Sequence, residues 1–175
     1  MTDSSHPSPT TPNYVDETIT LLGDRDPIAS LAEMPEWLTT HLDDLSETAL
    51  SVPEGPGKWS IVQVLAHLAD AELAFGWRAR LILTADRPLM VGYDENLWVE
   101  RFRYAEADAA EAFHAFSMQR RWNMHVWRSA TPADMKRVGV HSERGEETFD
   151  RLLRMAAGHD LRHQRQIMRI IATLP

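Results

Sequence analysis

The spacing of apolar residues along two long segments constrains the fold of this chain most. Apolar side chains recur every three or four residues after Ser60, and again from about Glu147 to Ala172. This spacing places them on one face of an α-helix. Ser60 and Gln63 form the pattern of a capping box, which predicts a helix that ends near Thr84. The apolar residues of this helix are Ile61, Val64, Leu65, Leu68, Phe75, Ile82 and Leu83.

Two further regions have helical spacing, at about residues 26–50 and 106–129. Within the first, we expect Pro35 to interrupt one helix and to begin another. Proline lacks a backbone N–H and is tolerated in the first turn of a helix more readily than in its interior. Thr131-Pro132 predicts one more short helical turn.

Long connections separate the predicted helices. Residues 86–105 form one, with a short helix near residues 94–102, and residues 138–145 form an extended one. Four long helices, two long connections and almost no strand pattern predict an all-α fold, a four-helix bundle. Residues 1–13 are rich in Ser, Thr and Pro and predict a disordered tail. Residues 14–175 are then a single domain.

Composition excludes several kinds of chemistry. The chain has 175 residues, no cysteine and a formal net charge of −8. Without cysteine there can be no disulfide, thiolate metal site, iron–sulfur cluster or cysteine nucleophile. Most of the negative charge falls in the first sixty residues, and the remainder is nearly neutral.

Charge and hydropathy also limit the expected partners. An acidic chain repels phosphate backbones, so we expect no nucleic-acid partner. No run approaches the roughly 20 apolar residues that cross a bilayer, so we expect no membrane partner. The first residues lack the basic and apolar regions of a secretory signal, so we expect a cytoplasmic protein.

His159 and His163 are the first candidate functional residues. They are four positions apart, which places them about 40° apart on one helix face. The same face carries Leu152, Ala156 and Ile170. A buried imidazole needs partners for both ring nitrogens, and a metal ion supplies one to each histidine of such a pair. Core histidines bonded to carbonyl groups fit the same pattern.

His67 adds a third imidazole, on the helix that starts at Ser60. It lies on the same face as the small residues Ala71 and Ala74, which leave room for an ion or a ligand. A lone histidine there is more often structural. Three histidines on the inner faces of two helices favour a metal site. The glutamate of the zinc-protease pattern His-Glu-x-x-His is absent, because Asp160 follows His159.

Several other polar residues are weaker candidates. Asp160 lies about 100° from the histidine face and is a candidate to orient a metal ligand. Gln166, one turn past His163, could contact a ligand or could simply be a polar residue near the helix end. Arg78 could bind a substrate carboxylate, or be solvated or paired. Trp59 fits packing better than ligand stacking, and His141 could approach one end of the bundle.

These residues resemble the DinB/YfiT-like family of small metal-binding bundle proteins. The resemblance rests on Lys58-Trp59-Ser60-Ile61, on His67-Leu68-Ala69-Asp70-Ala71-Glu72, on Gly145 before the last helix, and on His159-Asp160-x-x-His163-x-x-Gln166-Ile167. It implies an up-down-down-up order of helices and a homodimer. It also implies a divalent metal ion, zinc or nickel, held by His67, His159 and His163.

The resemblance implies chemistry on small molecules. Characterised members include transferases that use low-molecular-weight thiols, and older descriptions name hydrolases. Our leading hypothesis is a metal-dependent transferase that activates the thiol of a small co-substrate. Metal-dependent hydrolysis by a metal-bound water is the alternative, and a non-enzymatic metal-binding module is the third. The connection at 86–105, with Tyr93 and Trp98, could cover the site.

Overall fold

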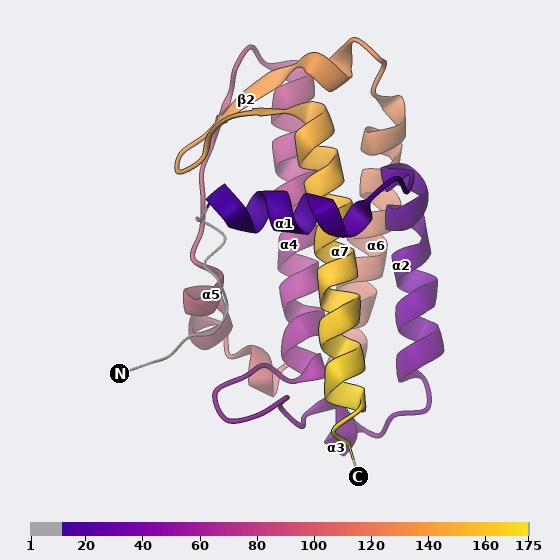
Figure 1. The fold of residues 1–175 in the computed structure, drawn as a ribbon. Coiled ribbons are helices and arrows are strands. Elements are labelled where there is room, and N and C mark those ends of the chain that lie inside the picture. Colours follow the sequence, from indigo (N-terminus) through magenta and orange to yellow (C-terminus); the bar gives the residue numbers. More distant parts are fainter. Residues whose placement is uncertain (1–11, 175) are drawn as a thin grey trace.

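Four long helices lie side by side in the computed structural model, which describes residues 12–174. They are α2 (Pro27–Leu42), α4 (Ile61–Thr84), α6 (Ala109–Ser129) and α7 (Phe149–Ile171). Figure 1 shows that α2 and α7 run in one direction and that α4 and α6 run in the other. The order along the chain is therefore up-down-down-up, and the predicted four-helix bundle is confirmed.

The parallel arrangement of α4 and α6 requires a long return along the side of the bundle. Residues 85–108 make this return and carry β1 (Leu89–Met90), α5 (Glu95–Arg101) and the 3₁₀ turn η1 (Tyr104–Glu106). The predicted short helix near residues 94–102 corresponds to α5. The capping box at Ser60 is also confirmed, since the Ser60 and Gln63 side chains each accept a hydrogen bond from the other residue's backbone N–H.

A small three-stranded sheet closes one end of the bundle (Figure 1). β1 pairs in parallel with β2 (Val138–His141), which pairs antiparallel with β3 (Gly145–Thr148). Sequence analysis expected only an extended connection here, because strands this short carry no clear alternation. The 3₁₀ turn η2 (Asp134–Lys136) precedes β2. The sheet joins the α4–α6 return to the α6–α7 connection.

The predicted interruption at Pro35 is wrong, because α2 continues through this residue. Proline cannot donate a hydrogen bond to the carbonyl group four residues earlier, which belongs to Leu31. That carbonyl accepts a hydrogen bond of 2.7 Å from the Arg120 side chain on α6 instead. A partner from another helix thus satisfies the group that Pro35 leaves free.

A helix that sequence analysis did not predict, α1 (Pro12–Leu22), crosses the outside of α7 (Figure 1). A Cβ atom at Gly158 of α7 would lie 2.1 Å from the Thr18 carbonyl oxygen of α1, so only glycine permits this close approach. Residues 1–11 of the predicted tail lie outside the described residues. A four-residue helix, α3 (Glu47–Leu50), follows α2.

The apolar core divides into two clusters along the bundle axis. On α7, the buried apolar residues up to Leu161 belong to one cluster, and Ile167 and Ile170 belong to the other. His159 and His163 therefore lie near the boundary between the clusters. None of the helices within residues 12–174 is long and apolar enough to cross a membrane.

Candidate metal centre

The fold brings the three predicted histidines together. His67 projects from α4, and His159 and His163 project from successive turns of α7. Their exposed fractions are 2%, 6% and 5%. The Nε2 atom of His159 lies 3.0 Å from Nε2 of His67 and 3.2 Å from Nε2 of His163. Three imidazole nitrogens therefore converge on one point inside the bundle.

The donor set fits a divalent cation. Zinc–nitrogen bonds of 2.0–2.1 Å in a tetrahedral site place neighbouring ligand nitrogens about 3.3 Å apart, close to the separations seen here. Burial, followed by the nearby His163 and His67, holds the pKa of His159 well below its ordinary value of 6.5. His159 is therefore neutral near pH 7, which is the form that binds a metal ion.

Gln166 contacts one of the histidines directly. Its Oε1 atom lies 2.9 Å from Nδ1 of His163. When Nδ1 carries the proton and donates it to this oxygen, the lone pair of the ring is on Nε2 and faces the other histidines. Such a hydrogen bond commonly orients a metal-binding histidine. Gln166 is thus placed to position His163.

Asp160 does not take the role that sequence analysis suggested. Within residues 12–174 it makes no hydrogen bond to a histidine, and both of its carboxylate oxygens bind Arg120, at 2.7 and 3.1 Å. Arg120 also binds Glu72 at 2.9 and 3.0 Å. The 100° offset turns Asp160 toward α6, away from His67 on α4. This buried network fixes α4, α6 and α7 beside the histidines.

Trp59 packs against the histidine cluster, as predicted. Its ring centroid lies 5.0 Å from that of His67 and 6.5 Å from that of His163, with the second pair nearly parallel. The Phe75 and His159 rings meet in a T-shaped arrangement with their centroids 5.5 Å apart. Aromatic rings thus contact all three histidines.

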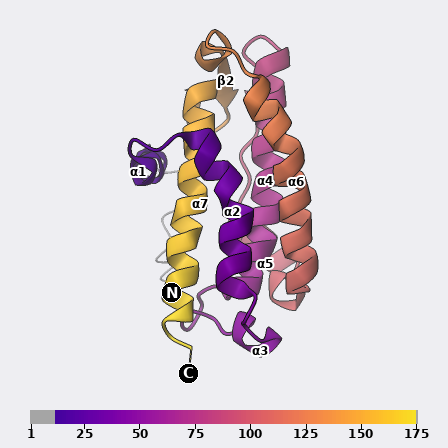
Figure 2. The ribbon, with the colours of Figure 1, turned by 90° about the vertical axis from the view of Figure 1, so that its right-hand side faces the viewer.

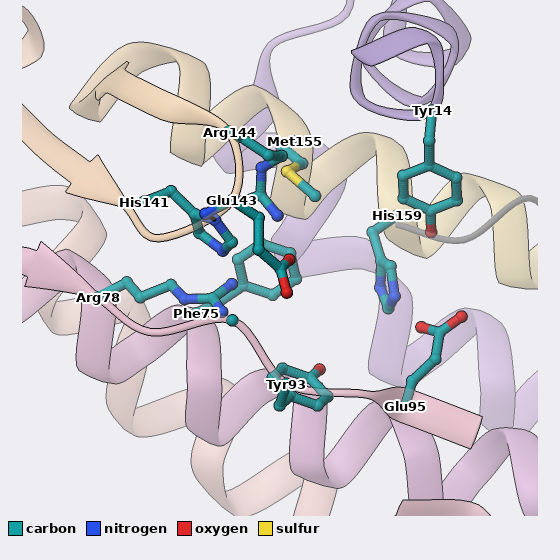
Figure 3. Close-up of a pocket in the computed structure, with 11 residues that line it drawn as sticks. Tyr14, Phe75, Arg78, Tyr93, Glu95, His141, Glu143, Arg144, Met155 and His159 are labelled. Atoms are coloured by element: carbon teal, nitrogen blue, oxygen red, sulfur yellow. Dashed lines mark hydrogen bonds between the residues drawn. The ribbon is translucent and has the colours of Figure 1, made fainter. Parts of the chain in front are cut away.

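A pocket that is partly open to solvent adjoins His159 (Figure 3). Side chains from five parts of the chain line it, namely Tyr14, Phe75, Arg78, Tyr93, Glu95, His141, Glu143, Arg144, Met155 and His159. The connection at residues 86–105, which we expected to cover the site, contributes Tyr93 to the lining of this pocket. Trp98 stacks behind Tyr93 at a centroid distance of 4.2 Å and does not line the pocket.

Several ionisable groups that line this pocket have shifted pKa values, and Glu95 and Tyr14 are two of them. Burial raises the pKa of Glu95 to about 7, with a further contribution from Asp94, while Arg162 lowers it. Burial also raises the pKa of Tyr14 to about 12. Near neutral pH, Glu95 can therefore exchange a proton, whereas Tyr14 keeps its own.

Several residues of the pocket could not be predicted from the sequence. Tyr14 lies on the unpredicted α1, and Glu95 and Arg144 lie on connections where no periodicity points inward. His141, proposed to approach a bundle end, reaches the pocket from the end of β2.

The fold and the histidine cluster together define a four-helix bundle with a candidate three-histidine metal centre. Residues 30–167 match the family model of the DinB superfamily. The chain therefore belongs to the DinB superfamily, as the sequence resemblance predicted.

Known relatives extend this comparison. A protein of Oceanobacillus iheyensis, named "Putative metal-dependent hydrolase", is 27% identical over 136 residues, which are 78% of each chain. A similarly named protein of Bacillus licheniformis is 30% identical over 122 residues, 69% of this chain and 68% of the relative. The structure of YfiT from Bacillus subtilis, described as an unusual four-helix bundle, superposes with a TM-score of 0.76 at 23% identity. That match covers 93% of this chain and 88% of YfiT.

Proposed function

We propose that this protein is a metal-dependent enzyme whose divalent ion, zinc or nickel, is held by His67, His159 and His163. The observation that carries the proposal is the convergence of three buried Nε2 atoms beside a pocket. Three neutral nitrogen ligands leave further positions on the ion for a substrate, as in catalytic zinc sites. A bound ion would lower the pKa of a thiol or a water molecule that it coordinates.

The reaction that we propose first is transfer of a low-molecular-weight thiol to an electrophilic co-substrate. The chain has no cysteine, so the thiol must enter with a substrate. Glu95 lines the same pocket as His159, and its pKa of about 7 suits it to accept the thiol proton. We also propose a cytoplasmic location, because small thiols stay reduced in that compartment.

Hydrolysis is the second candidate, and the names of the relatives favour it. Here water replaces the thiol as the nucleophile, and Glu95 accepts a proton from water. The same residues serve both reactions, so the identity of the nucleophile must be measured.

Cobalt-loaded protein distinguishes these candidates. Thiol transfer predicts that a small thiol changes the visible spectrum of the cobalt form, and that His67→Ala abolishes the change. Hydrolysis predicts turnover of model esters or amides without thiol, lost in the same variant. If neither occurs and His163→Ala only lowers the melting temperature, the protein is a metal-binding module and not an enzyme.

We further propose that the protein forms a homodimer. Four large apolar side chains on α4 and α6 are more than half exposed, namely Leu73, Trp77, Met118 and Trp122. Three of them line one surface groove, which makes this α4/α6 face the candidate contact with a second copy.

A further inference from the structure

The pocket beside His159 contains a second group of polar side chains, which the proposed metal centre does not use. Arg78 enters from α4 and is 7% exposed, and His141 enters from the end of β2 and is 2% exposed. Figure 3 shows the two side chains next to each other at one end of the pocket, away from Tyr14 and Glu95.

Arg78 is a buried cation that forms no salt bridge among residues 12–174, although Glu147 and Glu143 act on it at longer range and its guanidinium lies 5.8 Å from the centroid of the Tyr93 ring. Its Nη2 atom donates a hydrogen bond of 2.9 Å to the Val91 carbonyl oxygen. Burial lowers the pKa of Arg78 from its ordinary value, and Arg144 lowers it further. A guanidinium group has five N–H donors, and a buried cation is destabilising unless an anion or several acceptors compensate it.

His141 has a buried donor without an acceptor among the described residues. Its Nδ1 atom accepts a hydrogen bond of 3.2 Å from the backbone N–H of Glu143. A neutral imidazole that accepts at Nδ1 carries its proton on Nε2. Burial lowers the pKa of His141 to about 4, so the ring is neutral near pH 7. The Nε2 atom is buried and has no hydrogen-bond partner in this part of the chain.

The other charges of the pocket limit the negative charge of the group that can bind beside Arg78. Arg144 is already engaged, because its guanidinium binds both carboxylate oxygens of Glu147 at 2.6 and 3.0 Å. Glu95 and Glu143 also line the pocket. Arg78 is the only lining cation without a salt bridge among residues 12–174, so this end of the pocket favours a carboxylate group, which carries one negative charge, over a dianionic phosphate group. This limit applies to the group bound beside Arg78 and not to the rest of the ligand.

We propose that Arg78 and the Nε2–H group of His141 bind a carboxylate group of the substrate. The guanidinium supplies charge and a fork of donors, and the imidazole supplies one more donor. Because this group lies in the same pocket as His159, the inference deepens the proposed function. It identifies the substrate, or the thiol co-substrate, as a small carboxylic acid. The reactive end of this molecule would reach the histidine cluster while its carboxylate binds Arg78 and His141.

The test is the binding of succinate to the full-length protein, measured by calorimetry and by the NMR signal of the His141 Nε2–H group. Succinamide, which has the same shape without charge, and inorganic phosphate serve as comparison ligands. We expect succinate to bind saturably and with higher affinity than succinamide or phosphate. We also expect succinate to shift the NMR signal of the His141 Nε2–H group. Arg78→Gln and His141→Phe should each weaken succinate binding about tenfold or more.

Two further variants keep the result interpretable. Arg87→Gln removes an exposed arginine that pairs with Glu146 outside the pocket, and should bind succinate like the wild type. Arg78→Lys retains the charge, so it reports on the site if Arg78→Gln does not fold. We expect it to bind succinate more weakly than the wild type and more tightly than Arg78→Gln.

Several outcomes would overturn the carboxylate site. These are equal binding of succinate and succinamide, tighter binding of phosphate, or no saturable response to acetate, succinate or glutarate. Wild-type affinity in both Arg78→Gln and His141→Phe would also overturn it. His159→Ala separates this result from the proposed function. It removes a metal ligand, yet it should still bind succinate through Arg78 and His141.

Discussion

Gln166 contacts a ring nitrogen of one histidine in the cluster, on the side of the ring away from the other histidines. It binds Nδ1 of His163, while Nε2 of the same ring lies 3.2 Å from Nε2 of His159. We expect Gln166→Leu to lower the affinity for zinc about 10- to 100-fold, since the ring loses its orienting partner. Competition with a chelator measures this affinity. Gln166→Glu, which keeps an acceptor, is the control, and unchanged zinc affinity in Gln166→Leu would contradict this role.

Glu95 should make stability depend on pH. Its pKa is about 7 in the folded protein and 4.5 ordinarily, so the folded state binds this proton more tightly. The free energy of unfolding therefore falls as pH rises through 7, because the buried carboxylate must then ionise in the folded protein. The charged and titratable groups near it are Asp94, Arg162 and Tyr14.

The Glu95→Gln variant tests this pH dependence. It should be more stable than the wild type above pH 7, by up to about 3 kcal/mol, and the difference should vanish below about pH 4.5. Urea unfolding across this pH range measures it. A constant difference between the two proteins would show that Glu95 does not titrate as described.

At the residue scale, the histidines were predictable and their surroundings were not. His159 and His163 share an apolar helix face, so periodicity alone places them in the core. The role of Asp160 was predicted wrongly because the sequence does not show which helix lies across from it. Glu95 could not be predicted, because residues in connections have no periodicity that relates them to a core.

At the scale of elements, Arg120 joins four helices through one guanidinium group. It binds Glu72 on α4, Asp160 on α7 and the Leu31 carbonyl group on α2. Arg120→Leu would leave two buried carboxylates without a cationic partner, and among the described residues only Glu72 would keep a hydrogen bond, from Asn123. We expect it to lower the free energy of unfolding by about 3–5 kcal/mol, measured by urea unfolding.

The control for Arg120 is Arg165→Leu, which removes an exposed arginine of α7 and should change stability by less than about 0.5 kcal/mol. Equal effects of the two substitutions would contradict the structural role of the network. The same network explains why Pro35 misled the prediction of α2. A proline is tolerated inside this helix because Arg120, distant in sequence, binds the carbonyl group that it frees.

At the scale of the whole molecule, the long periodic segments predicted the four-helix bundle. They did not predict the structure of the segments that connect the helices. The small sheet and α1 depend on contacts between distant segments, such as β1 with β2 and Thr18 with Gly158. The local spacing of apolar residues does not predict such contacts. The pocket forms where such segments meet, so several of its lining residues, such as Tyr14 and Glu95, escaped prediction.

The proposed dimer also belongs to this scale. We expect the wild type to sediment as a dimer and Trp122→Glu to sediment as a monomer, because a charge on the α4/α6 face opposes its burial. Leu89→Glu, at an exposed apolar residue of β1, is the control and should stay dimeric. A monomeric wild type at micromolar concentration would contradict the proposal.

The metal content of untagged protein tests the central claim most directly. Elemental analysis of protein purified without a histidine tag should find about one zinc or nickel ion per chain, because three histidine nitrogens converge on one site. His159→Ala, purified in parallel, should hold far less. Folded wild-type protein without stoichiometric metal, or equal metal content in His159→Ala, would contradict the claim that His67, His159 and His163 form a metal centre.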